Sequence, residues 1–556
     1  MIPTTLPEAL DRAIKDYPTH GVGFIHNDKS VRWLTYSELR EEALGILSGF
    51  RNRGIATGEI VILSLDTCEE IVPILWACIL GGIVPAMLQP PVSFSDYNPA
   101  AEKAGKVYKI LDSPRIILSH SHMEIWRSSG ISEDKLIDIN EIPHANGDPQ
   151  IATPKPDDLV VIQFSSGSTG DPKGIMLSHR NVLTNIYDII KGSELVPEDI
   201  TINWMPLYHD MGLFGFHITP VVCRFSHYLM DPADFVKNPF LWLDSLDEKN
   251  CTVTACPNFG EMVVNRYLSR RTVKNWDLSK IRVLFNGAEP ISVPVMNEFT
   301  EALKLFGLRP ESMFPCYGMA EATLAITFGP VLRGAEVMNF RREPILKKGI
   351  AVPAEAGETD VMELVNLGKA LDNCRLKIAD SKGNPLEENK VGNIYLKGGN
   401  VTRGYFNNPE TTRKTFRDGW LYTGDLGFMY HGNLFVTGRI KDIIFINGIN
   451  YYAHDLEIIA LQVNGISAGK IVMSGYFDEK EGRDKVVVFM VGANTPAVHE
   501  TFQQIRDLFL QKAGLSIDTF IPIRSGDIPR TSSGKIQRYK LVNRFLRNEF
   551  PVILNL

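Results

Sequence analysis

Residues 164–174 read Phe-Ser-Ser-Gly-Ser-Thr-Gly-Asp-Pro-Lys-Gly, and this run constrains the fold and the chemistry of the chain more than any other. Glycines let successive backbone N–H groups point into one concavity, hydroxyls add donors, and a lysine adds the cation that a polyphosphate requires. The flanking patterns predict a buried strand over residues 159–164 and a helix over residues 178–190. We therefore predict a strand, a loop and a helix that hold phosphate, with the loop ligands Ser165, Ser166, Gly167, Ser168, Thr169, Gly170 and Lys173.

The loop does not have the spacing of the nucleotide-binding P-loop, which is G-x-x-x-x-G-K-[ST]. Counting five residues on from Gly167 reaches Pro172 instead of a glycine, and Lys173 is followed by Gly174. A kinase or GTPase therefore loses its main support. A flexible Gly/Ser surface loop stays open as an interpretation of this run taken alone.

Length and composition indicate a soluble globular protein of several domains, with 556 residues, 44% of them hydrophobic and 22% charged. The net charge of −7 without a basic block argues against a nucleic-acid partner. The seven cysteines form no CxxC pair, which predicts a reducing, cytoplasmic compartment without disulfides or zinc. No signal peptide is visible. The uncharged run 71–88 is long enough to span a membrane, but Pro73 and Gly81-Gly82 predict a buried helix, a turn and a strand instead.

Alternating helix and strand patterns in the N-terminal half predict the α/β class, with layered and mainly parallel sheets. From about residue 331 a turn at 381–385 between two strand patterns predicts a β-rich, barrel-like subdomain. Between Glu321 and Gly368 lies a long interval, and its residues 340–359 have no clear period, which predicts an unusually long loop. We expect a large domain over 1–438, a hinge at 439–442 and a small, mobile α+β domain over 443–556.

Further polar or glycine-rich segments stand out along the chain, at residues 206–213, 286–290, 317–323, 420–427, 438–439 and 529–535. Together with the loop at residue 165 they resemble, in order and in residue type, the motifs of the adenylate-forming superfamily. That superfamily contains acyl-CoA synthetases, peptide-synthetase adenylation domains and firefly luciferase. The resemblance covers nearly the whole chain, so chance does not explain it.

The resemblance implies that ATP and Mg²⁺ are bound and that Lys535 is catalytic. A carboxylate that approaches an anionic α-phosphate needs a cation between the two oxygens, which Lys535 would supply. Glu321 would hold Mg²⁺, because hard cations prefer carboxylate oxygen. Asp425, supported by Arg439, would accept from the ribose hydroxyls, while the loop grips the phosphates that leave. The remaining nucleotide contacts implied by the resemblance are Gly287, Ala288, Glu289, Tyr317, Gly318 and Met319.

Each of these residues alone also has a simpler structural interpretation. Lys535 and Lys441, the latter at the hinge position of the family, could be solvated surface lysines. Glu321 could be a glutamate at a helix N-terminus, Asp425 a turn aspartate, and Tyr317 a core side chain. The chain also departs from the superfamily at two positions, with Ala320 in place of the usual threonine and Ala453 in place of the usual proline.

Several features are similar to the fatty acyl-AMP ligases within this superfamily. Residues 206–213 match their motif with a gating histidine, here His209, and residues 256–259 match a segment that lines their acyl tunnel. The interval around 337–365 is similar to their insertion, which restrains the small domain and disfavours coenzyme A. The resemblance thus implies transfer of a fatty acyl group to the phosphopantetheine thiol of an acyl carrier protein. The expected acyl contacts are Met211, Gly212, Phe214, Asn258 and Phe259.

Three other functions stay open from the sequence. A coenzyme A ligase differs only in the second half-reaction. An amino-acid adenylation domain would need an acidic residue for the amino group, and Asp210 lies in a different motif. A catalytically silent acyl or nucleotide binder is disfavoured because Lys535, Glu321 and Asp425 are all retained.

Overall fold

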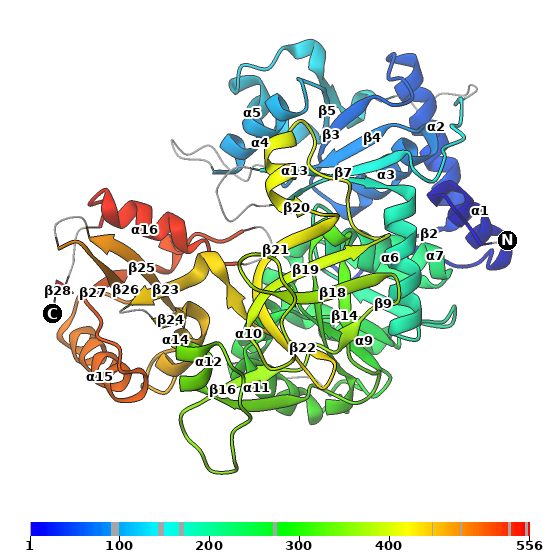
Figure 1. Cartoon of the computed structure of the whole chain (residues 1–556). Helices are drawn as coiled ribbons and strands as arrows, with labels where there is room; N and C mark the ends of the chain where they lie inside the picture. Colours follow the sequence, from blue (N-terminus) through cyan, green and yellow to red (C-terminus); the bar gives the residue numbers. More distant parts are fainter. Residues whose placement is uncertain are drawn as a thin grey trace.

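The computed structural model describes residues 2–90, 99–142, 149–165, 172–270, 275–446, 449–478, 481–531, 535–550 and 554–555. It shows layered sheets with helices on their faces and a smaller unit at the C-terminal end, coloured orange to red in Figure 1. The predicted loop ligands Ser166, Gly167, Ser168, Thr169 and Gly170 lie outside the described residues.

The N-terminal part contains a four-stranded parallel sheet in the order β4-β3-β5-β6. Helix α3 ends at Gly82, whose φ of 62° is the left-handed conformation that favours glycine, and strand β4 follows at once. This confirms the predicted helix, turn and strand over residues 71–88. The bounds are α1 (Leu6–Asp16), α2 (Tyr36–Asn52), β3 (Ile60–Ser64), α3 (Cys68–Gly81), β4 (Val84–Met87), α4 (Pro99–Ile110), β5 (Arg115–Leu118), α5 (Met123–Ser128) and β6 (Leu136–Asp138).

A nine-stranded sheet forms the second layer, in the order β17-β14-β13-β12-β11-β9-β10-β1-β2. Its central strands pair in parallel, and antiparallel strands lie at both edges. The strands are β1 (Gly21–Ile25), β2 (Val31–Thr35), β9 (Ile200–Asn203), β10 (Ser226–Met230), β11 (Val253–Ala255), β12 (Val283–Asn286), β13 (Met313–Gly318), β14 (Ala325–Phe328) and β17 (Lys369–Ala370). The helices are α6 (His179–Gly192), the π-helix η4 (Met211–Ile218), α7 (Thr219–Cys223), α8 (Pro232–Lys237), α9 (Pro239–Glu248), α10 (Asn258–Leu268) and α11 (Val293–Lys304).

The predicted order of strand, loop and helix around residue 165 is corrected in one respect. Strand β7 (Leu159–Ser165) is followed by a second strand, β8 (Lys173–Ser178), which pairs with it antiparallel, and α6 begins only after β8. Ile175 and Leu177 are buried, which explains why the segment after the loop continues as a strand. The loop therefore joins two antiparallel strands.

An antiparallel sheet of β18, β19, β20, β21 and β22 forms the predicted barrel-like part, and its strands are curved by register shifts. Its bounds are β18 (Cys374–Ala379), β19 (Gly392–Gly398), α13 (Pro409–Thr415), β20 (Phe416–Arg417), β21 (Trp420–Tyr430) and β22 (Asn433–Arg439). With the parallel sheets, it confirms the predicted fold class.

The interval around residues 340–359 has more structure than the predicted loop. Strands β15 (Val337–Arg341) and β16 (Val361–Val365) pair with each other, and helix α12 (Arg342–Lys348) lies between them. We call residues 337–365 the insert. Leu346 of α12 packs against the core of the C-terminal unit, so the helix is stabilised by a contact that is distant in sequence.

The C-terminal unit has its own core and a four-stranded sheet in the order β25-β26-β27-β28. It follows the short 3-10 helix η7 (Ile440–Asp442), where the hinge is predicted. Its elements are β23 (Ile443–Ile446), β24 (Ile449–Tyr452), α14 (Ala453–Ala460), β25 (Ile471–Asp478), β26 (Arg483–Val491), α15 (Pro496–Ala513), β27 (Thr519–Ile523), α16 (Arg538–Leu546) and β28 (Leu554–Asn555). Among all helices of the described residues, none is long and apolar enough to cross a membrane.

Two buried histidines make the stability of the fold dependent on pH. His179 Nδ1 accepts from the backbone N–H of Leu6 at 3.1 Å, and His217 Nε2 accepts from Trp76 Nε1 at 2.9 Å. Burial lowers the pKa of His179 to about 4 and that of His217 to about 3. Both histidines are therefore neutral in the folded protein.

We predict that the free energy of unfolding falls as the pH drops below about 6.5, because the unfolded chain takes up these protons first. At pH 5 each histidine should cost about 2 kcal/mol of stability, and the loss should be absent above pH 7. Urea unfolding at pH 7 and pH 5 measures the effect. His179→Asn keeps an acceptor for Leu6 but does not titrate, so an unchanged pH dependence in this variant would contradict the assignment.

Candidate active site

One cavity of about 1170 Å³ is lined by the second layer, the barrel-like sheet, the insert and the C-terminal unit. The predicted site residues that line it are Lys173, His209, Met211, Asn258, Ala288, Glu289, Tyr317, Gly318, Met319, Glu321, Asp425, Arg439, Lys441 and Lys535. The fold thus brings together residues from both ends of the chain.

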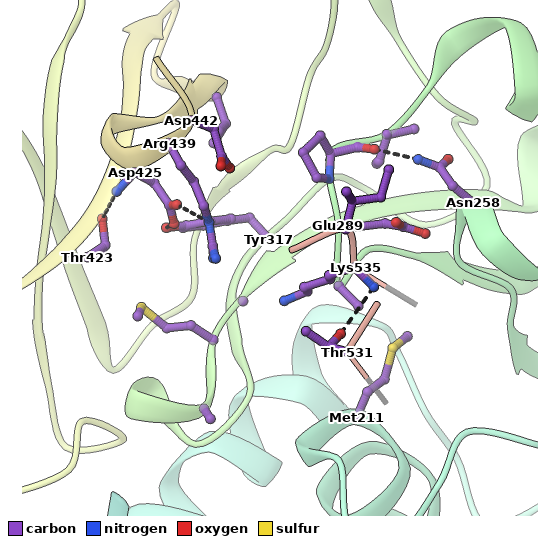
Figure 2. Close-up of a pocket in the computed structure, with 18 of the residues that line it drawn as sticks. Met211, Asn258, Glu289, Tyr317, Thr423, Asp425, Arg439, Asp442, Thr531 and Lys535 are labelled. Carbon is purple, nitrogen blue, oxygen red and sulfur yellow. Dashed lines mark hydrogen bonds and ion pairs between the residues drawn. The ribbon is translucent and has the colours of Figure 1, made fainter. Parts of the chain in front are cut away.

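Asp425 is buried and lies at the centre of a polar group at one wall of the cavity (Figure 2). Its Oδ2 accepts from the hydroxyl of Tyr317 at 2.6 Å, and its Oδ1 accepts from Arg439 Nε at 2.8 Å. The strands β21 and β22 position the pair, because Asp425 and Arg439 face each other in the register. The negative charge of Asp425 raises the pKa of Arg439, so the guanidinium stays charged. This geometry fixes a carboxylate that can accept from two neighbouring hydroxyls.

The family resemblance implies that Tyr317 packs against adenine together with Gly287 and Ala288, and in the structure the hydroxyl of Tyr317 also donates to Asp425. Burial raises the pKa of Tyr317 well above its usual range, and the charge of Asp425 adds to the effect. The phenol therefore remains a donor to the carboxylate. The stacking contact itself stays a prediction.

Two glycines near Tyr317 are explained by close packing. A Cβ on Gly318 would lie 2.0 Å from the carbonyl oxygen of Leu324, and a Cβ on Gly287 would lie 2.7 Å from Cys316 Sγ. Gly287 is not among the residues that line the cavity, so it acts by letting β12 pack closely on β13. Ala288, with a φ of 71°, turns the chain toward the cavity after β12.

Glu321 presents a nearly buried carboxylate to the cavity from the 3-10 helix η6 (Ala320–Ala322). Its Oε1 accepts from the hydroxyl of Tyr405 at 2.9 Å. Lys173 Nζ lies 5.0 Å from the centre of the Tyr405 ring. Tyr405 therefore connects the end of the predicted phosphate loop to the predicted metal ligand.

Lys535 of the C-terminal unit lines the cavity. Its backbone N–H donates to Thr531 Oγ1 at 3.1 Å, and its carbonyl oxygen accepts from Thr531 N at 2.8 Å. Figure 2 shows Lys535 next to Glu289, with a dashed line that marks its hydrogen bond to Thr531. Burial lowers the pKa of Lys535, and the charge of Arg439 lowers it further. The nearby carboxylates of Asp210, Asp425 and Glu289 oppose this shift.

His209 and Asp210 directly precede the first residue of the π-helix η4. His209 Nδ1 is 2.7 Å from Asp210 Oδ1, and the backbone N–H of Met211 donates to both side chains. Burial acts to raise the pKa of Asp210, but the interaction with His209 and the charge of Lys535 outweigh burial and lower it. The two side chains thus hold each other in a polar part of the cavity wall, where the charge of Lys535 acts on Asp210. A gating role for His209 stays a prediction.

An apolar part of the cavity wall, here called the apolar arm, comes from the nine-stranded sheet, η4, α6 and adjoining loops. Its buried walls are Ile189, Leu195, Met211, Phe216, Phe225, Val253, Phe285 and Phe328. Asn258 also lines the cavity, and its Oδ1 accepts from the backbone N–H of Ser292 at 3.1 Å. An arm with these walls suits a hydrocarbon chain.

Three of the residues that were predicted to contact the acyl chain do not line the cavity. Phe214 is buried in the hydrophobic core on the other side of η4, which turns Met211 and Phe216 toward the cavity instead. A Cβ on Gly212 would lie 2.3 Å from the carbonyl oxygen of Pro206, so this glycine serves close packing. Phe259 packs on the core, and its backbone N–H donates to Glu289 Oε1 at 2.9 Å.

Sequence reasoning missed several residues of the site. Tyr405 lies in no recognisable motif, and only its hydrogen bond to Glu321 in the structure identifies it as part of the site. Met362 and Leu364 of the insert also line the cavity, although the sequence there has no clear pattern. Arg530 lies inside the motif 529–535, and its charge acts on Glu289. Burial raises the pKa of Glu289, while Arg530 and then Lys535 oppose this.

The profile of the family described as "AMP-binding enzyme" matches residues 10–406 of the chain. A protein of Caulobacter vibrioides, provisionally named acyl-CoA synthetase, is 30% identical over 567 residues, covering 98% of each chain. A medium-chain-fatty-acid–acyl-carrier-protein ligase of Moorena producens is 30% identical over 553 residues, covering 94% of this chain and 92% of that protein.

The fold also matches solved structures along its whole length. One structure, from a study of fatty acyl-adenylate ligases of E. coli and L. pneumophila, has a TM-score of 0.88 at 29% identity and covers 98% of each chain. Together with the family match, this confirms the resemblance to the adenylate-forming enzymes that the motifs indicated.

Proposed function

The chain belongs to the AMP-binding enzyme family and is a ligase, and from this premise we propose that it activates a fatty acid with ATP. A carboxylate oxygen attacks the α-phosphorus of ATP, the bond from that phosphorus to the bridging oxygen breaks, and pyrophosphate leaves. The phosphopantetheine thiol of an acyl carrier protein then attacks the carbonyl carbon of the acyl adenylate, and AMP leaves as the thioester forms.

One observation carries this proposal. A single cavity is lined by Lys535, by the bonded residues Tyr317, Asp425 and Arg439, and by an apolar arm. Lys535 supplies a cation for two approaching anions. The group of Tyr317, Asp425 and Arg439 fits a ribose, and the apolar arm fits a hydrocarbon chain. The names of the similar proteins support a fatty acid as the substrate.

The residues present also fit a magnesium ion held jointly with the phosphates of ATP. The carboxylate of Glu321 lines the cavity, and no set of three or more metal-ligating side chains lies together within the described ranges. Mg²⁺ usually takes one or two protein carboxylates and completes its shell with phosphate oxygens and water. When bound, the ion would neutralise phosphate charge, and Glu321, oriented by Tyr405, would hold it.

The test is incorporation of labelled pyrophosphate into ATP with medium- and long-chain fatty acids. We expect exchange that requires both ATP and a fatty acid. Absence of exchange with every fatty acid would overturn the proposal, and exchange with amino acids alone would favour an amino-acid adenylation domain. Purified acyl adenylate is then offered with coenzyme A and, in parallel, with holo carrier protein. Rapid formation of acyl-CoA would instead favour the activity in the name of the Caulobacter relative.

A contact of the insert with the C-terminal unit supports the carrier protein as acceptor. Arg342 of α12 forms a buried ion pair with Asp455 of α14, and its Nε donates to Asp360 Oδ1 at 3.0 Å. Burial raises the pKa of Asp455, while Arg342 opposes this effect. We infer that the ion pair restrains the C-terminal unit in the arrangement with Lys535 in the cavity and so disfavours coenzyme A.

We predict that the double variant Arg342→Met, Asp455→Asn forms acyl-CoA about 10-fold faster than the unaltered chain, because a buried ion pair no longer restrains the unit. Both residues are replaced so that no buried charge is left unpaired. Acyl adenylate formation should change less than about threefold. The rates of acyl-CoA and acyl-carrier-protein formation from purified acyl adenylate check this. Equal acyl-CoA rates in both proteins would contradict the inferred restraint.

A further inference from the structure

A polar side chain lies in the wall of the apolar arm. Thr201, the second residue of β9, lines the cavity and is only 1% exposed. Its Oγ1 is buried and has no hydrogen-bond partner among the residues that the structure describes. A buried hydroxyl that loses water without gaining another partner destabilises a protein, so nearly all such groups are paired. The unpaired hydroxyl of Thr201 therefore points to a partner that the cavity receives from outside.

The register of the nine-stranded sheet places Thr201 inside the apolar arm. Thr201 pairs with Val253 of β11, which is one of the apolar walls. Residues that pair across parallel strands point to the same face of a sheet, and the next residue along each strand points to the other face. The next pair, Ile202 and Thr254, does not line the cavity. The side chain of Thr201 thus lies beside that of Val253, on the face that bounds the arm.

The polar side chain on the other side of Thr201 already has its own partners. Thr201 pairs with His227 of β10. His227 Nε2 lies 3.0 Å from His217 Nδ1, and His227 Nδ1 lies 3.2 Å from the hydroxyl oxygen of Tyr36. Both ring nitrogens of His227 are therefore engaged, and the neighbouring strand offers no side-chain partner to Thr201 at this level of the sheet.

Two other unpaired oxygens of the cavity wall have different surroundings. Gln163 Oε1 and Ser292 Oγ are also buried, and neither has a hydrogen-bond partner within the described ranges. Gln163 belongs to β7 and Ser292 directly precedes α11, so neither is part of the nine-stranded sheet. Thr201, by contrast, lies in that sheet beside an apolar wall residue, where a hydrocarbon chain would pass.

Thr201 also lies far from the nucleotide end of the cavity. Across the sheet it is level with Val283 of β12. The next residue, Leu284, pairs with Met313 of β13, and Tyr317 lies four residues further along β13. Tyr317 is therefore five residues beyond the level of Thr201, which corresponds to about 16 Å at about 3.3 Å per residue. A fatty acid whose carboxylate reacts near Tyr317 would bring the distal part of its chain to Thr201.

We propose that Thr201 selects fatty acids that carry an oxygen substituent, a hydroxyl or a keto group, on the distal part of the chain. The threonine hydroxyl can donate to either group and can also accept from a hydroxyl. A plain hydrocarbon chain that fills the arm would leave Thr201 Oγ1 unpaired, which weakens its binding. This assignment rests on the proposed function, because it names the class of fatty acid that the arm takes.

Pyrophosphate exchange with a matched set of medium-chain acids tests the selection. The set contains the plain acid, the α-hydroxy acid, and isomers with a hydroxyl or a keto group at successive distal positions, which distinguish the two substituents. We expect a distal isomer to have a KM about 10-fold below that of the plain acid, because it supplies the missing partner of a buried hydroxyl. The α-hydroxy acid should gain nothing. The kcat and the KM for ATP should hardly change, since Thr201 is remote from the reacting atoms.

Three variants assign this preference to the hydroxyl of Thr201. Thr201→Val keeps the shape of the side chain without the hydroxyl, so it should lower the KM for the plain acid, raise the KM for the preferred isomer and abolish the preference. Thr201→Ser keeps the hydroxyl and should keep the preference. Thr327→Val is the matched control, because Thr327 Oγ1 is likewise buried without a partner in the described part of the chain, but Thr327 does not line the cavity. It should leave the preference unchanged.

Failure of this inference can be told apart from failure of the proposed function. Equal KM values for all the acids would overturn the selection by Thr201, although the exchange itself would still support the proposed function. A preference that survives in Thr201→Val, or that is lost equally in Thr327→Val, would also overturn the selection. If no acid supports exchange, the proposed function fails, and calorimetric titration of the full chain with the same acids still decides whether Thr201 selects among them.

Discussion

Replacing Lys535 with alanine is expected to slow acyl adenylate formation about 1000-fold, because the variant loses the positive charge between the carboxylate and the α-phosphate. The side chain of Lys535 is half-buried in the cavity wall, and within the described part of the chain it forms no ion pair. Asp210, Asp425 and Glu289 lie close enough for their charges to act on it. The loss should therefore appear in kcat, with a smaller change in the KM for ATP.

A second measurement on the same variant separates catalysis from folding. When purified acyl adenylate is supplied, Lys535→Ala should still transfer the acyl group at a rate within about threefold of the unaltered chain, because the lysine has no part in thiol attack. Lys512→Ala, an exposed lysine of α15 bonded to Gln462, is the control and should behave normally in both steps. Normal exchange by Lys535→Ala would show that another cation performs the first step.

Replacing Asp425 with asparagine is expected to raise the KM for ATP about 100-fold. Two hydrogen bonds from ribose hydroxyls to a carboxylate are lost or weakened, and each is worth about 1.5–3 kcal/mol. The amide also cannot neutralise Arg439, whose Nε lies 2.8 Å from Asp425 Oδ1. Steady-state kinetics with saturating fatty acid measure the change, and the KM for the fatty acid should stay nearly constant.

Tyr317→Phe is the matched control for this prediction. It removes only the hydroxyl that donates to Asp425 at 2.6 Å and keeps the ring in the cavity wall. We expect a rise of no more than about 10-fold in the KM for ATP, which corresponds to one hydrogen bond. If both variants lost the same affinity, Asp425 would act by orienting Tyr317 and not by contacting the ribose.

Local sequence patterns predicted the elements whose stability is mostly local. The uncharged run 71–88 became α3 and β4. The motifs also indicated fourteen of the residues that line the cavity. Hydrophobic periodicity, helix breakers and loop chemistry act over a few residues, so one sequence is enough to interpret them.

Other features depended on contacts between distant residues. Strand β8 forms because residues 173–178 pair with β7, and α12 forms where Leu346 packs on the C-terminal unit. Neither segment has a pattern strong enough to predict this by itself. The placement of Phe214 in the core was likewise decided by the way η4 packs. Tertiary packing overrides weak local preference at such positions.

The sequence by itself determined the chemical inventory of this protein: the glycine-rich loop, the carboxylates Glu321 and Asp425, and the lysine at position 535. Only the tertiary structure decided how these groups combine, since it places Lys535 in the same cavity as Asp425 and Glu321. The physical reason is that charge interactions depend on distance and burial, and both are fixed only when separate units of the chain pack against each other.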